Sequence, residues 1–100
     1  NNIQVFFMKN KTDLITDVHK DLKSEGLVTQ REQTKKIVDI VINNIRNYIV
    51  HGITIEIVNF GKFYTKFITR SNFGKEKIKR WSIYFSPAIK LKNDINEDQT

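Results

Sequence analysis

The side chains best able to do chemistry in this sequence are cations, and they are concentrated in one segment. Residues 53–85 hold seven lysines and arginines against two glutamates, while the whole chain has a formal net charge of +6. Such a segment predicts a surface that binds a polyanion, and an ordinary solvated basic face is the alternative. The seven cations are Lys62, Lys66, Arg70, Lys75, Lys77, Lys79 and Arg80.

Side chains suited to catalysis or metal binding are scarce. The sequence has no cysteine and two histidines, His19 and His51, so a disulfide, a thiolate site and a zinc site are not expected. Asp17 and Asp21 lie one helical turn apart among lysines, as on a solvated helix face, and the four glycines form no phosphate-binding loop. We therefore predict a protein that is not an enzyme and that has no cofactor, no metal and no small-molecule substrate.

Two helices are predicted in the first half of the chain, which at 100 residues makes one domain with a small core. Thr12 as the N-cap and an apolar stripe at helical spacing predict a helix that ends near residues 24–26. Residues 29–32, Thr-Gln-Arg-Glu, form a capping-box pattern that predicts a second helix as far as about Val50, with Gly52 at its end. No apolar run is long enough to span a bilayer, so we expect no membrane association.

The second predicted helix is apolar on more than one side, which indicates an obligate dimer. In so small a chain, a helix this apolar needs a second copy to cover it, and the alternative is a helix central to a monomeric core. We expect a homodimer formed through this helix and the sheet. The predicted interface residues are Ile37, Val38, Val41, Ile42, Ile45, Ile49, Phe60, Phe63 and Phe85.

After Gly52 the apolar period changes to two, which predicts a three-stranded sheet. The expected strands cover residues 53–57, 62–69 and 77–85. Ser86 is then expected to cap a short last helix that has Pro87 at its first helical position. The predicted order is α-α-β-β-β-α, which is an α+β fold.

Aromatic side chains on the third predicted strand have two interpretations. Trp81 and Tyr84 are of the kind that stack on unpaired bases, which would suit an RNA or single-strand binder. Trp81 shares a strand face with Ile83 and Phe85, however, and this favours packing in the core. We therefore expect Trp81 to be a core residue.

Three segments resemble one protein family, in order and with matching spacing. Residues 10–15, Asn-Lys-Thr-Asp-Leu-Ile, resemble the opening of bacterial HU and integration host factor (IHF) proteins. Residues 59–63, Asn-Phe-Gly-Lys-Phe, resemble the Gly-Phe-Gly-x-Phe turn of that family. Residues 85–92, Phe-Ser-Pro-Ala-Ile-Lys-Leu-Lys, resemble the Phe-Arg-Pro-Gly-x-x-Leu-Lys that opens its last helix. The similarity covers about residues 8–95.

The resemblance implies an intertwined dimer whose helical body carries two β-ribbon arms that embrace DNA through the minor groove. Because members of this family form both homodimers and heterodimers, the resemblance leaves a heterodimer with a paralogue as the alternative to a homodimer. Residues 1–8 are then expected to be an N-terminal extension and residues 96–100 a polar tail. Residues 9–95 would form the HU/IHF-like DNA-binding domain, in which the three-stranded sheet extends into an arm at about residues 66–80.

The arm departs from the family pattern in two ways. The family's tip reads Arg-Asn-Pro-x-x-Gly and places its proline between base pairs, whereas residues 70–74 read Arg-Ser-Asn-Phe-Gly and contain no proline. Phe73 falls at or beside the wedge position, so it is either an intercalating residue or a turn residue folded onto its own ribbon. The arm is also shorter than in the family, which leaves the bend angle and the site size open.

We expect the chain to bind and bend double-stranded DNA with little sequence specificity, because the minor groove presents a degenerate code. The alternative is an HU-like dimeric structural or interaction protein whose DNA binding is weakened or lost. The expected location is the cytoplasm, associated with the nucleoid, or, for a phage-encoded protein, the host cytoplasm or the virion. The predicted DNA-binding residues are Lys62, Lys66, Arg70, Asn72, Phe73, Lys75, Lys77, Lys79, Arg80, Lys90 and Lys92.

Overall fold

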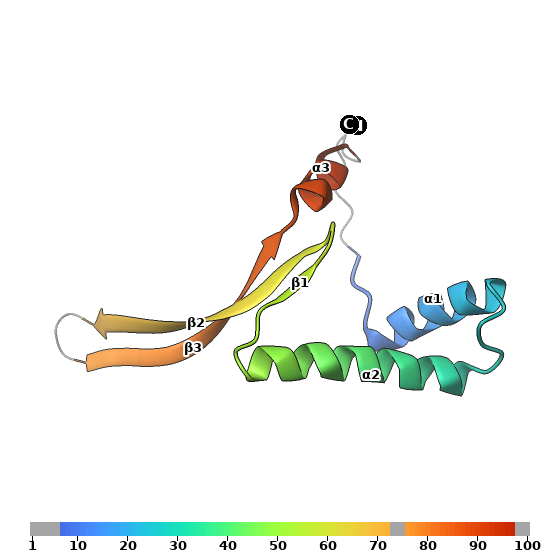
Figure 1. The fold of residues 1–100 in the computed structure, drawn as a ribbon, viewed down its shortest axis with the longest axis horizontal. Coiled ribbons are helices and arrows are strands. Elements are labelled where there is room, and N and C mark those ends of the chain that lie inside the picture. Colours follow the sequence, from blue (N-terminus) through green and yellow to red (C-terminus); the bar gives the residue numbers. More distant parts are fainter. Residues whose placement is uncertain (1–6, 73–75, 98–100) are drawn as a thin grey trace. The chain divides into compact units, whose positions relative to one another are not determined.

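The computed structural model describes the backbone of residues 7–72 and 76–97, and the side chains of residues 7–69 and 79–97. The order of the elements is the predicted α-α-β-β-β-α (Figure 1). The chain divides into two compact units, Asn1–Asn44 and Ile45–Thr100, which are described separately below. The elements are α1 (Lys11–Ser24), α2 (Arg31–Val50), β1 (Ile55–Ile57), β2 (Gly61–Asn72), β3 (Glu76–Pro87) and α3 (Ile89–Glu97).

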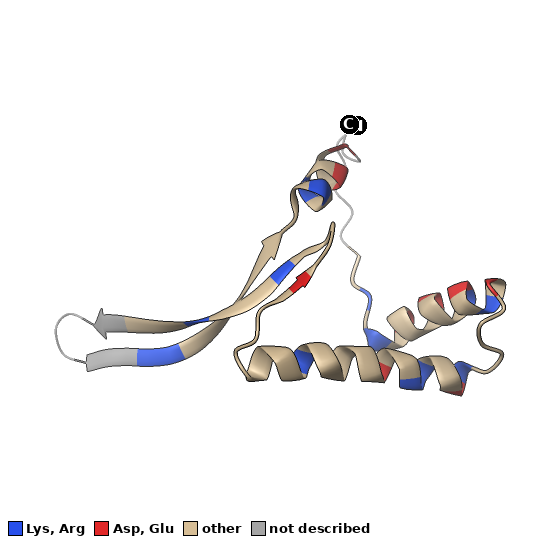
Figure 2. Cartoon of the chain, in the orientation of Figure 1, with Lys and Arg blue, Asp and Glu red and all other residues tan. Residues whose placement is uncertain are grey.

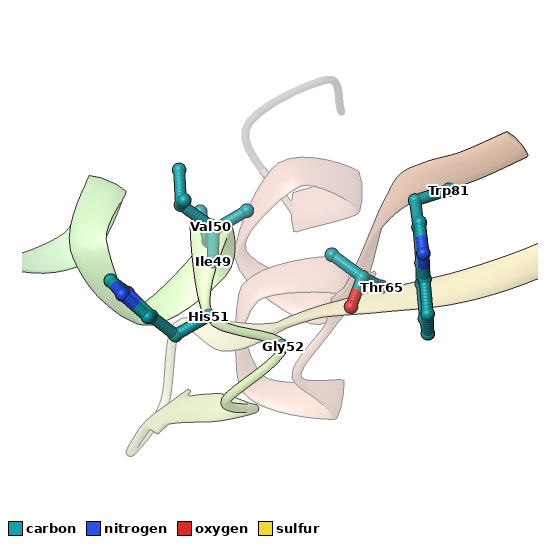
Figure 3. A pocket seen from close by; sticks show the side chains of 6 residues that line it. All are labelled: Ile49, Val50, His51, Gly52, Thr65 and Trp81. Carbon is teal, nitrogen blue, oxygen red and sulfur yellow. The ribbon is translucent and has the colours of Figure 1, made fainter.

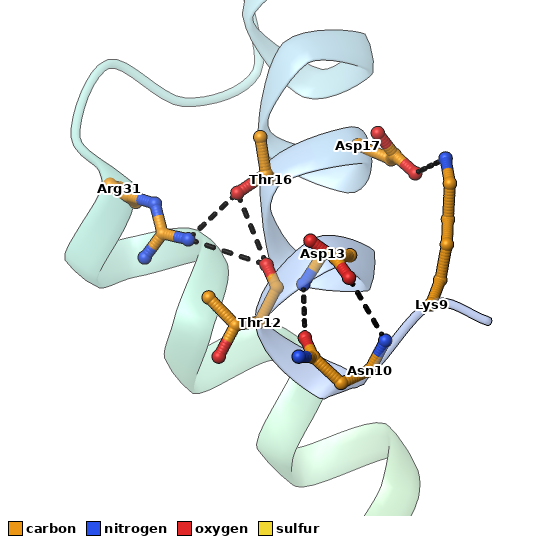
Figure 4. A network of polar contacts seen from close by, with 7 residues as sticks. All are labelled: Lys9, Asn10, Thr12, Asp13, Thr16, Asp17 and Arg31. Atoms are coloured by element: carbon orange, nitrogen blue, oxygen red, sulfur yellow. Dashed lines mark hydrogen bonds and ion pairs between the residues drawn. The ribbon is translucent and has the colours of Figure 1, made fainter.

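Helix α1 begins with a reciprocal capping box whose cap lies two residues earlier than predicted. The Asn10 side chain accepts a hydrogen bond from the backbone N–H of Asp13, and the Asp13 carboxylate accepts one from the backbone N–H of Asn10, both at 3.0 Å (Figure 4). Two N–H groups without helical partners are thereby satisfied at once. The prediction of Thr12 as the N-cap is therefore wrong, because Thr12 lies inside the helix.

Helices α1 and α2 both end at the expected glycines. Gly26 and Gly52 have φ angles of 71° and 72°, a left-handed conformation that costs glycine little. After α1, the N–H groups of Gly26 and Leu27 donate to carbonyls of the last helical turn, and after α2 those of Gly52 and Ile53 do the same. These paired bonds are the Schellman arrangement, which satisfies carbonyls that the helix leaves free.

The start of α2 is close to the predicted position, but its capping chemistry differs. The helix begins at Arg31, and the side-chain oxygen of Gln33 accepts hydrogen bonds from the backbone N–H groups of Thr29 and Gln30, each at 3.3 Å. The predicted capping box has Thr29 as the N-cap and the Glu32 carboxylate as the acceptor three residues later. In the structure the helix begins at Arg31, so Gln30 is the N-cap and Gln33 is the third helical residue. The Gln33 side-chain amide therefore takes the acceptor role that was predicted for the Glu32 carboxylate.

Within the unit of residues 1–44, α1 and the first half of α2 enclose a small core. Thr34 is completely buried, and its hydroxyl lies 2.8 Å from Nδ1 of His19. Arg31 donates to the Thr16 hydroxyl at 2.8 Å (Figure 4). Among the described side chains, the buried apolar ones are Ile15, Val28 and Val38.

The sheet is antiparallel in the order β1-β2-β3, and most of it is a two-stranded ribbon (Figure 1). Strand β1 pairs only with residues 61–63 of β2, whereas β2 and β3 stay paired from Gly61 opposite Pro87 to Asn72 opposite Glu76. The second and third strands are thus longer than predicted, and the first begins two residues later. The additional residue pairs at the far end of the ribbon include Ser71 and Asn72, which are residue types common in turns.

The predicted role of Pro87 at the start of the last helix is wrong. Pro87 is the last residue of β3, where it lies opposite Gly61, and α3 begins at Ile89. The backbone N–H of Ala88 donates to the carbonyl of Phe60 at 3.0 Å, which ties the chain to the β1–β2 turn before the helix starts. A proline at the end of an edge strand removes no interior ladder hydrogen bond, so this position tolerates it.

Candidate nucleic-acid interface

The alternation of side chains along β2 and β3 gives the ribbon two chemically different faces. One face, here the cationic face, carries Lys62, Tyr64, Lys66 and Ile68 of β2, which lie opposite Ser86, Tyr84, Ser82 and Arg80 of β3. The other, here the aromatic face, carries Phe63, Thr65, Phe67 and Thr69, which lie opposite Phe85, Ile83, Trp81 and Lys79.

On the cationic face two lysines surround a stacked pair of tyrosines. The rings of Tyr64 and Tyr84 have centroids 5.6 Å apart and an interplanar angle of 19°. The Lys66 ammonium lies 5.8 Å from the Tyr64 centroid and 5.6 Å from the Tyr84 centroid, and that of Lys62 lies 5.9 Å from Tyr64. These distances fall within the range of cation–π attraction.

An open hollow of about 320 Å³ lies beside these tyrosines. Its lining residues supply two ammonium groups and several hydroxyls, and none of them is a carboxylate. Glu56 of β1 is the register partner of Lys62, but it does not line the hollow. The lining is formed by Thr54, Lys62, Tyr64, Thr65, Lys66 and Ser86.

The predicted DNA-binding residues fall into three groups in the structure. Lys62, Lys66 and Arg80 share the cationic face, and Lys79 lies on the aromatic face. Figure 2 shows lysines and arginines along both β2 and β3 of the ribbon. Lys90 and Lys92 are exposed on α3, where Lys90 forms an ion pair with Asp94 at 3.0 Å. Phe73 and Lys75 lie outside the described residues, and Arg70, Asn72 and Lys77 are described only by their backbone.

The predicted interface residues of the sheet form one cluster on the aromatic side. The centroids of Phe63 and Phe85 lie 4.7 Å apart, and Phe60 lies 5.7 Å from Phe85. Phe60 and Phe85 are both exposed in the single chain. The cluster therefore leaves apolar ring surface uncovered by its own sheet.

The predicted interface residues of α2 differ in burial. In the single chain Val41 is 52% exposed, and Ile37 and Ile42 are also exposed. Ile45 and Ile49 are half-buried. Val38 is only 6% exposed and belongs to the core of the 1–44 unit, so it does not join the apolar surface that its neighbours form.

Trp81 is not a core residue of the single chain, contrary to the prediction. Its side chain is 68% exposed, and its ring lies 5.2 Å from that of Phe67. Figure 3 shows Trp81 and Thr65 on one side of a hollow of about 300 Å³, opposite the end of α2. The alternation of side chains places Trp81 on the aromatic face, as the sequence predicts, but the side chain remains largely exposed on that face.

The stacked tyrosines are the part of the site that sequence reasoning missed. The sequence alone indicates no role for Tyr64 and suggests only base stacking for Tyr84. The available signal was the alternation Lys62, Tyr64, Lys66, which puts all three on one face of a strand. Only the register with β3 reveals that Tyr84 is the cross-strand partner.

Lysines near the start of α1 are engaged within their own unit. Lys9 pairs with Asp17 at 2.7 Å, and this hydrogen bond together with the Asp17 charge raises the pKa of Lys9 above 10.5 (Figure 4). Lys11 forms an ion pair with Asp39. The ammonium groups of Lys9 and Lys11 are thus paired with carboxylates of the same unit.

The described part of the chain contains neither a cluster of metal ligands nor a membrane-spanning helix. No group of three or more His, Cys, Asp or Glu side chains there is placed to hold a metal ion. None of the described helices is long and apolar enough to cross a bilayer.

Comparison with known proteins gives a consistent result. Residues 9–96 match the sequence family described as "Bacterial DNA-binding protein". The fold resembles HU from Anabaena in a cocrystal with DNA, with a TM-score of 0.63, 18% identity, and coverage of 87% of this chain and 97% of that one. It also resembles a mutant of HU from Thermotoga maritima, with a TM-score of 0.60, 28% identity, and coverage of 87% and 99%. No curated protein matches the sequence significantly.

Proposed function

This chain belongs to the bacterial DNA-binding protein family of HU and integration host factor, and on that premise we propose that it is an architectural protein that binds and bends double-stranded DNA. It acts without catalysis, as a dimer, and reads the shape and flexibility of the duplex more than its base sequence. Its ribbon arms enter the minor groove, where the base code is degenerate.

The cationic face of the ribbon is the observation that carries this proposal. Lys62, Lys66 and Arg80 share that face, and the segment that contains them has five more cations than anions. Exposed ammonium and guanidinium groups along a strand pair suit backbone phosphates, which supply affinity through release of counterions. Further phosphate contacts toward the arm tip are assigned to Arg70, Asn72, Lys75 and Lys77. Phosphates that flank the ribbon are assigned to Lys79, Lys90 and Lys92.

The dimer is proposed because much of the apolar surface of one chain lacks a cover. The exposed residues of α2 and the Phe60, Phe63 and Phe85 cluster are the surfaces that a second copy would bury. Burial of this area is the driving force for association. The partner is an identical chain or a paralogue of the same family.

Phe73 is proposed as the wedge that enters an opened base step. A phenyl ring is flat and apolar, as are the side chains that other minor-groove proteins insert between base pairs. The family's proline is absent from residues 70–74, which leaves Phe73 as the apolar residue nearest the tip. Family membership also supports a cytoplasmic, nucleoid-associated location, whether the protein is encoded by the cell or by a phage.

A binding titration against salt tests the function. We expect the full chain to bind a duplex of about 40 base pairs and to lose affinity linearly in log–log coordinates as salt rises. The double variant Lys62→Gln/Lys66→Gln should bind more weakly, with a salt slope smaller by about 0.9 for each phosphate that the protein no longer neutralises. Lys20→Gln/Lys23→Gln, which removes the same charge from α1, is the matched control and should bind as the wild type does.

The rival function is an HU-like interaction protein that has lost DNA binding. The missing proline of the arm is the observation in its favour. A dimeric chain that fails to shift duplex DNA even at low salt would establish this rival and would overturn the proposal.

A further inference from the structure

The Tyr64–Tyr84 pair occupies an unusual place for two aromatic side chains. The rings do not belong to the aromatic face but stand among lysines on the cationic face, half-buried and stacked on each other. Direct cross-strand pairing fixes their separation, because Tyr64 is the register partner of Tyr84. The strand register therefore fixes the position of the two rings, next to lysine side chains that are long and flexible.

Each lysine next to this pair has its ammonium group held over a ring. The Lys66 ammonium is almost equally far from the two ring centroids, at 5.8 and 5.6 Å, and the Lys62 ammonium is 5.9 Å from Tyr64. A free lysine samples many rotamers and loses that freedom when it binds a phosphate. A lysine already held by a ring face has less freedom to lose.

The hollow beside the tyrosines has the chemistry of a phosphate site. Lys62 and Lys66 contribute positive charge to its lining, and Thr54 and Ser86 contribute hydroxyl donors. Its volume of about 320 Å³ and its open side admit one group of an extended polymer. Unpaired bases are less well suited, because each tyrosine ring already faces the other ring and an ammonium group.

We propose that Tyr64 and Tyr84 are positioning residues that hold the ammonium groups of Lys62 and Lys66 beside this hollow, which takes one backbone phosphate of duplex DNA. The inference rests on the proposed DNA binding and assigns one of its phosphates to a specific place. In this role the tyrosines act on the phosphate through the two lysines.

A set of double variants in the full chain tests this role. Tyr64→Phe/Tyr84→Phe keeps both ring faces and should bind duplex DNA within about twofold of the wild type. Tyr64→Thr/Tyr84→Thr removes the rings and replaces them with β-branched residues that favour strands, and we expect about fivefold weaker binding with an unchanged salt slope. Phe67→Thr/Trp81→Thr removes the neighbouring aromatic pair from the opposite face and is the matched control for ribbon stability.

A thermodynamic cycle separates positioning from a merely structural effect. If the tyrosines act through the lysines, Tyr64→Thr/Tyr84→Thr should cost no further affinity once Lys62→Gln/Lys66→Gln is present. A loss of the same size in both backgrounds, or no loss in the wild-type background, would overturn the proposal. So would a preference of the wild type for single-stranded DNA that disappears with the rings, because it would make the tyrosines a stacking platform.

Measurements without DNA keep the inference distinct from the proposed function. Ring currents of the tyrosines should shift the ε-methylene proton signals of Lys62 and Lys66 upfield in NMR spectra, and the shift should survive in the phenylalanine variant and vanish in the threonine variant. Inorganic phosphate at low salt should perturb these same signals. If the chain binds no DNA but the ring-current shifts and the response to phosphate are both observed, the proposed function is wrong and the phosphate site is retained. If the ring-current shifts are absent, the positioning role of the tyrosines is wrong even when the chain binds DNA.

Discussion

At the scale of single residues, the buried polar group of the 1–44 unit is held by one specific contact. Thr34 is completely buried, and its hydroxyl has His19 as its partner at 2.8 Å. We expect Thr34→Val to lower the free energy of unfolding by about 1 kcal/mol, because the hydrogen bond is removed while the volume is kept. Urea denaturation measures this, with Thr34→Ser as the control that keeps the hydroxyl. Equal stability of Thr34→Val and the wild type would show that the hydrogen bond contributes nothing.

Of the three glycines in the described part of the chain, Gly61 is the one at which an added methyl group should destabilise the fold most. A Cβ atom there would lie 2.6 Å from the Phe85 ring and 2.7 Å from the backbone oxygen of Ser86, and φ is +155°. Gly61→Ala should therefore cost about 3 kcal/mol or more of unfolding free energy, from steric overlap and backbone strain together.

Gly26 provides the comparison for that substitution. It has φ of +71° and no atom within 4 Å of an added Cβ. Gly26→Ala should cost about 1–2 kcal/mol, the conformational penalty alone. Chemical denaturation of both variants measures the difference, and a Gly61→Ala variant as stable as Gly26→Ala would contradict the steric argument.

The Lys9–Asp17 pair gives a stability contribution with a defined pH dependence. Hydrogen bonding to Asp17 raises the pKa of Lys9 in the folded chain above 10.5. A group whose pKa is raised by folding stabilises the fold at pH values below its unfolded pKa, and the contribution disappears as the pH rises through the folded value. Both groups are exposed, so the effect is small.

The test compares melting temperatures of the wild type and Lys9→Gln across that pH range. The wild type should be slightly more stable at pH 8, and the difference should fade above pH 10.5. Other groups that titrate there are common to both proteins and cancel in the difference. A difference that grows with pH would contradict the assigned sign.

At the scale of the elements, the sequence predicts the type and order of the helices and strands but not the residues at which they begin and end. The period of 3.6 in the first half and of two after Gly52 predict the first two helices and the three strands. The last helix is present as predicted from Ser86 and Pro87, although Pro87 ends β3 and the helix begins at Ile89. The cap of α1 was misplaced because Thr12 and Asn10 are both good caps, and only the reciprocal bond with Asp13 decides between them. The strands were cut short because Ser71 and Asn72 are turn-type residues, which cross-strand pairing nevertheless holds in the ribbon.

The candidate site was predictable in composition but not in geometry. The charge pattern predicts Lys62, Lys66, Lys79 and Arg80 together, whereas the strand register places Lys79 on the aromatic face. The stacking of Tyr64 on Tyr84 depends on a register between residues twenty positions apart, which no local pattern determines. Trp81 was assigned to a core because its face was apolar, although a face can be apolar without being covered within its own chain.

The arm is the element whose tip is expected to deform DNA. Phe73→Ala should reduce the bend of a bound duplex while leaving its affinity within a few-fold, because phosphate contacts by the ribbon persist when the wedge is removed. Energy transfer between dyes at the two ends of a short duplex measures the bend at saturating protein. An unchanged transfer efficiency would remove Phe73 from the role of wedge.

At the scale of the whole molecule, the cationic ribbon and the uncovered apolar surfaces point to the same assembly. A single short chain buries too little apolar surface for much independent stability. In the described part of this chain the buried apolar side chains are Ile15, Val28 and Val38, all within the 1–44 unit. No apolar side chain among the described ones of the 45–100 unit is buried, which is the pattern we expect of a unit that a second copy covers.

A charge at Val41 distinguishes a dimer from a monomer with an exposed helix. Val41 is 52% exposed in one chain, so Val41→Asp should change the stability of a monomer little. In a dimer that buries this face, the carboxylate would lose its water without gaining a partner, which is strongly unfavourable. We therefore expect Val41→Asp to sediment as a monomer or to unfold, whereas the wild type sediments as a dimer whose melting temperature rises with protein concentration. Asn43→Asp, which adds the same charge at another exposed position of α2, should remain dimeric, and a Val41→Asp variant that stays dimeric and stable would place the interface on a different surface.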